Sequence, residues 1–195
     1  MKKSVVIIAP GETERRALPF LVRHLQDHGI TVDDVRIPPR NKLLNLMMAE
    51  KLIKSVWYEN LNSPPDKFIM VMDLDGTHPD EVLAPIQSRL PARLRGIEAC
   101  VLYAYAQHHL EAWYFADARN LREYLGRDLG QVDTSKPDEI RNPKLHLKHL
   151  LGNRVYTARI SEEIAKILNT STIAERSPSF RIFVDSIMNG DSMAC

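Results

Sequence analysis

The chain has little of what defines disulfide-rich and membrane-spanning proteins. Its 195 residues include two cysteines, Cys100 and Cys195, which lie far apart and show no spacing typical of a metal or redox motif. No apolar run approaches the roughly 18 residues that crossing a bilayer requires. The apolar segment behind the basic start of the chain is too short for a signal peptide. We therefore expect a cytoplasmic protein with no membrane contact, and we expect Cys100, which lies in an apolar run, to be part of the core.

The chain also lacks an excess of charge of either sign. Lysine and arginine number 26 and aspartate and glutamate number 25, so the formal net charge is +1. A near-neutral chain is not attracted to nucleic acid as a whole, and any such contact must be local. Internal repeats and low-complexity tracts are absent too. With 44% hydrophobic and 26% charged residues, the composition is that of one globular domain with a proper core.

The order of hydrophobic patterns predicts an α/β fold. Strands are expected over residues 4–9, 32–37, 68–72 and 98–105, and helices over residues 12–28, 43–60 and 79–90. This alternation predicts a mostly parallel, four-stranded central sheet flanked by helices, with right-handed crossovers. A helix-rich part follows, with helices expected over residues 108–125, 143–151, 162–167 and 179–188. We expect these later helices to pack on one side of the sheet, with Gly29 ending the first helix.

The chain is expected to divide after the first helix of this second part. Residues 1–125 would form the α/β core, and residues 126–189 would form a helical C-terminal extension packed on it. The segment from residue 126 to residue 143 is rich in turn-forming residues and would join the two parts. Residues 190–195 are expected to form a disordered tail.

The strongest chemical signal is a pair of aspartates behind the third expected strand. The apolar run 68–72 ends in Asp73 and Asp75, and the chain then turns at Gly76 and Pro79. Because alternate residues of a strand point the same way, both carboxylates would lie on one side of the strand end. Two like charges there favour a hard cation such as Mg²⁺ or Mn²⁺. The alternative is a solvated turn in which Asp75 caps the next helix, and spacing alone does not decide between the two.

Two more carboxylates open the helix that follows the first expected strand. If the first and third strands are neighbours, Glu12 or Glu14 could approach Asp73 and Asp75. Acidic residues in a first helical turn also interact favourably with the helix dipole, and Thr13 could cap the helix. A structural role for either glutamate therefore remains an alternative.

A further carboxylate follows the fourth expected strand. Glu111 lies near the start of an aromatic-rich helix, where it either caps the helix or points back across the strand ends. His108 and His109 are adjacent and cannot both face one metal from a helix, so we rank them below Glu111. Asp117, about one and a half turns further on, is expected to be a local capping or surface group.

Basic residues near these acids are candidates for phosphate contacts. Lys144 and Lys148 lie four residues apart, hence on one helix face, with Arg141 close by. A solvated cationic face is the favoured alternative, because the chain as a whole is not basic. Arg15 and Arg16, just past the first turn, have the same ambiguity.

Five short motifs form a pattern over almost the whole chain. They are Gly11-x-Thr13-Glu14, Asp73-x-Asp75, Glu111-Ala112-Trp113, Asn142-Pro143-Lys144 and Phe180-x-x-Phe183. Together they resemble an uncharacterised group of bacterial Toprim-like proteins. Toprim is the topoisomerase-primase domain, which also occurs in overcoming-lysogenization-defect (OLD) nucleases. Its pattern has an acidic residue after the first strand and an Asp-x-Asp pair after the third.

The resemblance implies a Toprim-like fold and a magnesium- or manganese-dependent nuclease that hydrolyses phosphodiester bonds. It implies that Glu14, Asp73 and Asp75 bind the metal, that Glu111 joins them in catalysis, and that nucleic acid is the partner. Lys144 and Lys148 are the weaker candidates for nucleic-acid contact. Because such proteins are often thought of beside ATPases in bacterial defence, the resemblance also implies a defence effector with an ATPase partner. A homodimer is compatible with this expectation.

One position departs from the Toprim pattern. A glutamate normally precedes the glycine after the first strand, but this chain has Pro10 there, which can neither bind a cation nor transfer a proton. Glu12 or Glu14 could replace the missing group, or the site could bind metal weakly without catalysis, or it could bind a nucleotide or partner without cutting. We favour the first alternative, because the remaining carboxylates would be costly to cluster without a cation. The competing functions are an inactive Toprim-like regulatory or interaction subunit and a small-molecule phosphohydrolase.

Overall fold

The protein is described by a computed structural model that covers residues 3–40, 42–98 and 100–189. Its centre is a four-stranded sheet in the order β2-β1-β3-β4, in which every pair of neighbouring strands is parallel. The strands are β1 (Lys3–Ile8), β2 (Ile30–Arg36), β3 (Lys67–Asp73) and β4 (Cys100–Ala106). The predicted α/β class and the parallel four-stranded sheet are therefore confirmed, and the first and third strands are neighbours.

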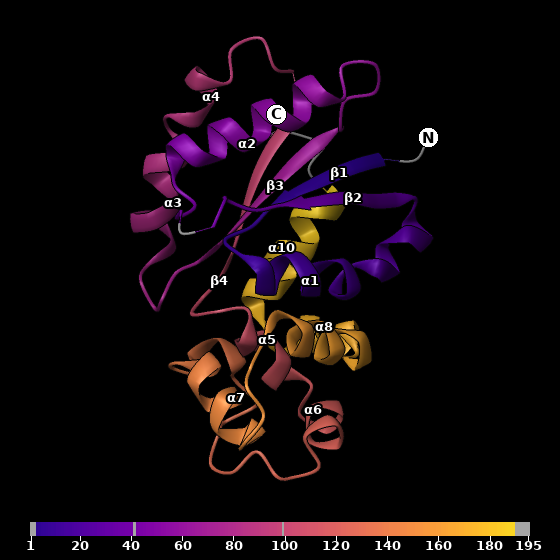
Figure 1. Cartoon of the computed structure of the whole chain (residues 1–195), viewed down its shortest axis with the longest axis vertical. Helices are drawn as coiled ribbons and strands as arrows, with labels where there is room; N and C mark the ends of the chain where they lie inside the picture. The colour runs from indigo at the N-terminus through magenta and orange to yellow at the C-terminus, as the bar shows by residue number, and fades with distance from the viewer. Residues whose placement is uncertain (1–2, 41, 99, 190–195) are drawn as a thin grey trace.

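Helices cover both faces of the sheet (Figure 1). Helix α1 (Glu12–Leu21) packs on one face, while α2 (Leu46–Glu59), α3 (Pro79–Gln87) and α4 (Leu90–Arg93) cover the other. Successive strand residues point to opposite faces, so Val5 and Ile7 enter one core and Val6 and Ile8 the other. Burial on both faces explains why the strands read as nearly continuous apolar runs.

The first predicted helix is divided in two. After α1 the chain continues as a 3₁₀ helix, η1 (Arg23–His28), which ends at Gly29 as predicted. Gly29 has a φ of +75°, a left-handed conformation that glycine adopts without steric cost.

The second half of the chain consists of short helices. They are α5 (Glu111–Ala116), α6 (Ala118–Leu125), η2 (Pro137–Glu139), α7 (Pro143–Leu151), α8 (Ala158–Ile167), α9 (Thr170–Arg176) and α10 (Pro178–Asn189). Helix α7 has its predicted bounds, whereas α9 and η2 were not predicted. The helix predicted over residues 108–125 is broken at Asp117, whose side chain caps α6 by accepting a bond from the backbone N–H of Asn120 at 3.4 Å. The capping prediction for Asp117 is confirmed, but the residue is buried and not on the surface.

The late helices do not all lie on the sheet. Helix α10 runs back across β4 and β3 on the face that α1 covers, whereas α8 packs on α1 and the other helices gather beyond the carboxyl end of β4 (Figure 1). Trp113 of α5 stacks on Phe183 of α10 with a centroid distance of 5.4 Å and meets Phe180 edge-on at 5.1 Å. Residues on both sides of the predicted boundary at residue 125 thus share one core, and the division into two parts stays a prediction.

Three further expectations concern the cysteines, the tail and the membrane. Cys100 is half-buried at the start of β4 and not in the core, while Cys195 and the tail 190–195 lie outside the described residues. Across the described ranges, no helix combines the length and the apolar character that crossing a bilayer demands.

Candidate functional site

The order of the strands brings the predicted carboxylates to one edge of the sheet. Because β1, β3 and β4 are neighbours and parallel, the segments after their carboxyl ends meet, which is where open α/β sheets bind ligands. Glu14 comes from α1, Asp73 is the last residue of β3, and Glu111 is the first residue of α5. The three lie near enough for the charges of Asp73 and Glu111 to raise the pKa of Glu14.

Glu14 is the inward-facing glutamate of the first helical turn. Its side chain is buried, and burial together with Asp73 and Glu111 raises its pKa to about 7, against smaller opposing effects of its own backbone and Lys144. A Cβ atom added to Gly11 would lie 3.3 Å from Oε2 of Glu14, so the carboxylate folds back over the turn between β1 and α1. Glu12 is exposed and forms an ion pair with Arg15 at the surface. The structure therefore brings Glu14 into the site and leaves Glu12 outside it.

Asp73 and Asp75 are brought together by a histidine and not by strand geometry. The strand ends at Asp73, and Asp75 has a left-handed φ of +50°, so the predicted alternation does not extend to it. Nδ1 of His109 donates to Oδ2 of Asp73 at 3.3 Å, and Nε2 lies 3.2 Å from Oδ1 of Asp75. Asp75 also does not cap the next helix, because the His78 side chain does.

His109 is the site residue that sequence reasoning ranked too low. The hydrogen bond that His109 donates to Asp73 is the largest effect on the pKa of His109 and raises it, and the charges of Asp73 and Asp75 add to this against the opposing effect of burial. The imidazole of His109 thus lies between the two aspartates, where a cation was predicted, and its raised pKa favours the protonated form there. The contact could have been predicted from the strand order. Because β3 and β4 are adjacent and parallel, the loop that carries His109 lies beside the turn that carries Asp75.

Backbone hydrogen bonds hold these two loops side by side. The N–H of Asp75 donates to the carbonyl of His108 at 3.3 Å, and that of Gly76 donates to the carbonyl of Gln107 at 2.8 Å. Gly76 has a φ of +81°, and a Cβ atom there would lie 2.7 Å from Cε1 of His108. The turn behind the Asp pair therefore requires a glycine for two reasons, its backbone conformation and the ring packed against it.

Glu111 is the most deeply buried carboxylate of the site. It has no exposed surface, and within the described part of the chain neither of its oxygens receives a hydrogen bond of normal geometry. Its nearest cation is Lys144 of α7, whose Nζ lies 3.7 Å from Oε1. Beside it, burial raises the pKa of Tyr114 and of Tyr156, and the charge of Glu111 adds to both effects. A buried carboxylate with so little compensation is unusual and marks a candidate functional group.

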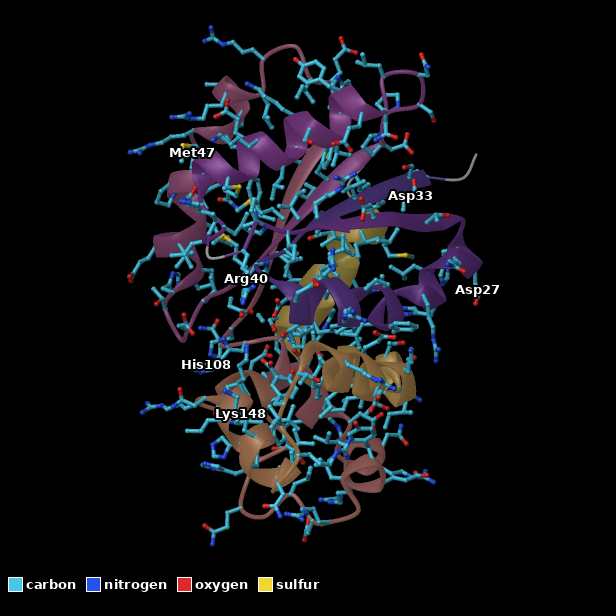
Figure 2. The ribbon with its side chains drawn as sticks, viewed as in Figure 1. Asp27, Asp33, Arg40, Met47, His108 and Lys148 are labelled. Atoms are coloured by element: carbon cyan, nitrogen blue, oxygen red, sulfur yellow. The ribbon has the colours of Figure 1, made fainter. Side chains whose placement is uncertain are left out.

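The remaining basic candidates have different surroundings. Arg16 pairs with Glu162 of α8 at 3.0 Å, which fixes it to a neighbouring helix. Lys148 is exposed in the last turn of α7, on the flank of the molecule that also carries His108 (Figure 2). Arg141 is exposed too, and its charge helps burial and His109 to lower the pKa of His108. Phosphate contacts by Lys144 and Lys148 stay predictions.

The donor chemistry of the site fits a hard divalent cation. Carboxylate oxygens are the ligands that Mg²⁺ and Mn²⁺ prefer, and among the described residues no donor bonds to the oxygens of Glu111 in normal geometry. Within the described ranges, however, no three histidine, cysteine, aspartate or glutamate side chains are arranged to hold one ion. His109 occupies the space between Asp73 and Asp75, so joint ligation by these two requires its ring to move.

The fold is an α/β fold similar to that of the C-terminal region of OLD proteins. The chain is similar over 95% of its length to 94% of the C-terminal region of the OLD protein of Xanthomonas campestris pv. campestris, with a TM-score of 0.51 and 16% identity. The C-terminal region of the Burkholderia pseudomallei OLD protein gives a TM-score of 0.49 and 16% identity over 96% of this chain and 98% of that one. Residues 11–188 match the family described as Domain of unknown function (DUF4276), and the chain belongs to this family. No curated protein matches the sequence.

Proposed function

We propose that this protein is a Toprim-like nuclease that hydrolyses phosphodiester bonds of nucleic acid with Mg²⁺ or Mn²⁺. The observation that carries the proposal is the cluster of Glu14, Asp73 and Glu111 at the carboxyl edge of the sheet, two of which are buried. Like charges in a low dielectric raise one another's pKa and are costly, and a bound cation removes that cost. The fold shared with an OLD C-terminal region and the motifs along the chain support the same class.

Each carboxylate has a proposed role. Asp73 and Asp75 would hold the metal once the His109 ring has moved from between them, Glu14 would add a ligand or act as the base, and Glu111 would add a fourth carboxylate. A divalent ion bound there supplies a polarised phosphoryl oxygen and a water of lowered pKa. In the metal-free site the pKa of Glu14 is about 7, so in the role of a base Glu14 would exchange a proton near neutral pH, whereas in the role of a metal ligand it would be ionised. We propose that Glu14 in this way replaces the glutamate that Pro10 displaces.

The basic residues of α7 would contact the substrate. Lys144 forms an ion pair with the buried carboxylate of Glu111, and it would form an ion pair with the phosphate of a substrate that enters the site. Lys148, exposed one turn further along the same helix, would contact the backbone of the strand. We further propose, from the motif resemblance, that the protein is the effector of a bacterial defence system with an ATPase partner.

A second candidate function is a catalytically inactive regulatory or interaction subunit with the same fold. The contacts of His109 with Asp73 and Asp75 favour it, because the imidazole ring occupies the space between them and the two aspartates raise its pKa. Pro10 favours it as well, because it removes one carboxylate from the expected set.

One experiment separates the two functions. Purified protein is incubated with plasmid DNA, single-stranded DNA and tRNA in Mg²⁺ or Mn²⁺, beside the variant Asp73→Ala and the matched control Asp27→Ala. Asp27 is exposed at the end of η1, on the flank opposite His108 (Figure 2). We expect cleavage by the wild type and by Asp27→Ala, and a loss of about a hundredfold or more in Asp73→Ala, because a metal ligand supplies several kcal/mol of transition-state stabilisation.

The possible results have distinct meanings. Cleavage that survives Asp73→Ala contradicts the assigned site. Absence of cleavage on all three substrates, together with absence of metal binding in calorimetry, contradicts the nuclease and supports the inactive subunit.

A further inference from the structure

A second concave site lies beside the carboxylate cluster. It is a cavity of about 610 Å³ between the segment 129–141 and helix α7. Its floor is apolar and consists of Leu129 and Ile140, which are buried, and Val132 and Leu150, which are half-buried. The volume lies within the range of roughly 300–1,000 Å³ that is usual for small-ligand sites, and an apolar floor with few polar groups is their usual lining.

The acidic groups at the rim of the cavity are already engaged. The carboxylate of Asp133 accepts hydrogen bonds from the N–H of Ser135 at 3.0 Å and from its hydroxyl at 2.6 Å. The carboxylate of Glu139 lies 3.2 Å from Nζ of Lys136. Lys136 therefore offsets the charge of Glu139, while Asp133 stays negatively charged, because the hydrogen bonds from Ser135 lower its pKa.

The other ionisable groups at the rim have no such partners. The side chains of Arg141, His146 and His149 line the cavity, and none of them makes a hydrogen bond or an ion pair with any residue in the described part of the chain. His146 and His149 lie three residues apart and so share one face of α7. The cavity thus offers an apolar floor, two flat imidazole rings and one guanidinium with its donors unused.

We propose that this cavity binds a nucleoside phosphate, with the base on the apolar floor against the imidazoles and the phosphate on Arg141. Flat bases stack on histidine and on apolar side chains in sequence-tolerant sites. A guanidinium matches phosphate with two parallel, charge-assisted hydrogen bonds. A purely apolar ligand would leave Arg141 unused, and a simple anion would leave the floor uncovered.

Residues that line the cavity are close in sequence to residues of the carboxylate site. Arg141 lies three residues before Lys144, which contacts Glu111, and the charge of Arg141 reaches His108, next to His109. If the proposed nuclease function holds, and only then, the occupant is a nucleotide of the strand adjacent to the phosphate that is cut. The same chemistry is met by a free nucleotide, so the two sources are compared directly.

The test is a titration of the full chain in EDTA, without divalent metal. Calorimetry measures the binding of AMP, adenosine, inorganic phosphate and a single-stranded hexanucleotide to the wild type, Arg141→Ala, His149→Ala and the control Arg95→Ala. Arg95 is an exposed arginine between α4 and β4, outside the cavity. We expect AMP to bind more tightly than adenosine or phosphate, Arg141→Ala to weaken AMP about tenfold or more without affecting adenosine, and Arg95→Ala to change neither.

His149→Ala extends the test to the base, and we expect it to weaken adenosine and AMP by similar factors. Competition between the hexanucleotide and AMP in the wild type supports the cavity as a site for a strand, and binding of AMP alone supports it as a site for a free nucleotide. Absence of AMP binding, or equal losses in Arg141→Ala and Arg95→Ala, overturns the proposal. Because no metal is present, this titration tests binding independently of cleavage. If the protein binds AMP but cleaves no nucleic acid, only the proposed nuclease function is overturned. If it cleaves nucleic acid but does not bind AMP, only the proposed nucleotide site is overturned.

Discussion

At the scale of single residues, two side chains set the charge at the strand ends. Glu14 is only 4% exposed, and its pKa is raised to about 7 by burial first, then by Asp73 and Glu111. The pKa of His109 is raised as well, and the protonated form of its imidazole would offset the charges of Asp73 and Asp75. The raised pKa values of Glu14 and His109 both favour the protonated form of these groups, which lowers the net negative charge of the site.

This balance predicts a pH-dependent stability that depends on Glu14. The pKa of Glu14 is about 7 in the folded chain and 4.5 without the influence of the fold. Between these two pH values the folded chain therefore binds a proton at Glu14 that the unfolded chain releases. The stability that this proton contributes is fully present below about pH 4.5 and is lost as the pH rises towards 7. We expect Glu14→Gln to be more stable than the wild type at about pH 8, by up to roughly 3 kcal/mol, and similar to it at about pH 4. Denaturant unfolding at both pH values measures this, and equal pH dependence in both proteins contradicts it.

Gly76 is the second residue whose replacement has a predictable cost. Gly76→Ala must adopt a φ of +81° and displace the His108 ring from 2.7 Å, whereas Gly96→Ala has a similar φ of +85° with no atom within 4 Å of its Cβ. We expect both to lose about 1 kcal/mol through the backbone and Gly76→Ala to lose about 1 kcal/mol more through the ring. Adding His108→Ala should remove the extra loss in a double-mutant cycle. Equal losses for the two alanine variants would contradict the packing argument.

At the scale of elements, a buried polar network holds the start of α10. The carboxylate of Asp138 in η2 accepts hydrogen bonds from the Ser177 hydroxyl at 2.7 Å, the Ser179 N–H at 2.8 Å and the Ser179 hydroxyl at 2.9 Å. The Ser179 oxygen in turn accepts a bond from Nε1 of Trp113 at 2.8 Å. The network connects η2, α5 and α10, three elements from distant parts of the chain.

Loss of this network should loosen α10. We expect Asp138→Ala to lower the free energy of unfolding by about 3 kcal/mol, because it leaves buried donors of two serines without their acceptor. Asp133→Ala is the matched control: within the described ranges that carboxylate accepts its hydrogen bonds from the nearby Ser135, and we expect a loss below about 1 kcal/mol. Urea unfolding gives the two values, and hydrogen exchange locates the change in α10. Similar losses in both variants would show that the network does not anchor the helix.

At the scale of the whole molecule, the net charge of +1 limits how nucleic acid can be bound. Some basic residues near the site are already paired, as Arg15 is with Glu12 and Arg16 with Glu162. Around α7, Arg141 and Lys148 are exposed. Binding by such a surface must involve few phosphates.

The prediction is a weak dependence of nucleic-acid affinity on salt. We expect the logarithm of the binding constant to fall with the logarithm of salt concentration with a slope of about −2 to −3, and Lys148→Ala to reduce the slope by about 1. Fluorescence anisotropy with a labelled single strand at several salt concentrations measures both. A slope near −6 would show that the interface is wider than α7 and its surroundings.

Features that depend on neighbouring residues in the sequence were predicted, and features that depend on contacts between distant residues were not. The four strands, Gly29 and the bounds of α7 were predicted because local apolar patterns and turn residues determine them. The break at Asp117 and helix α9 were missed, because Asp117 also accepts a bond from the N–H of Asn169 at 2.7 Å, a residue far along the chain. Of the candidate site, Glu14, Asp73 and Glu111 are brought together, whereas the contacts of His109 depend on which loops are neighbours.

By itself the sequence determined the class of the fold, the acidic residues at the strand ends and the departure at Pro10, because these follow from residue type and local spacing. Only the tertiary structure decided the meaning of the Asp73 and Asp75 pair. The left-handed backbone at Asp75 ends the alternation that the sequence predicted, and the neighbouring loop inserts His109 between the two carboxylates. Long-range contacts also chose Glu14 over Glu12, since one is buried against other acids and the other is paired at the surface.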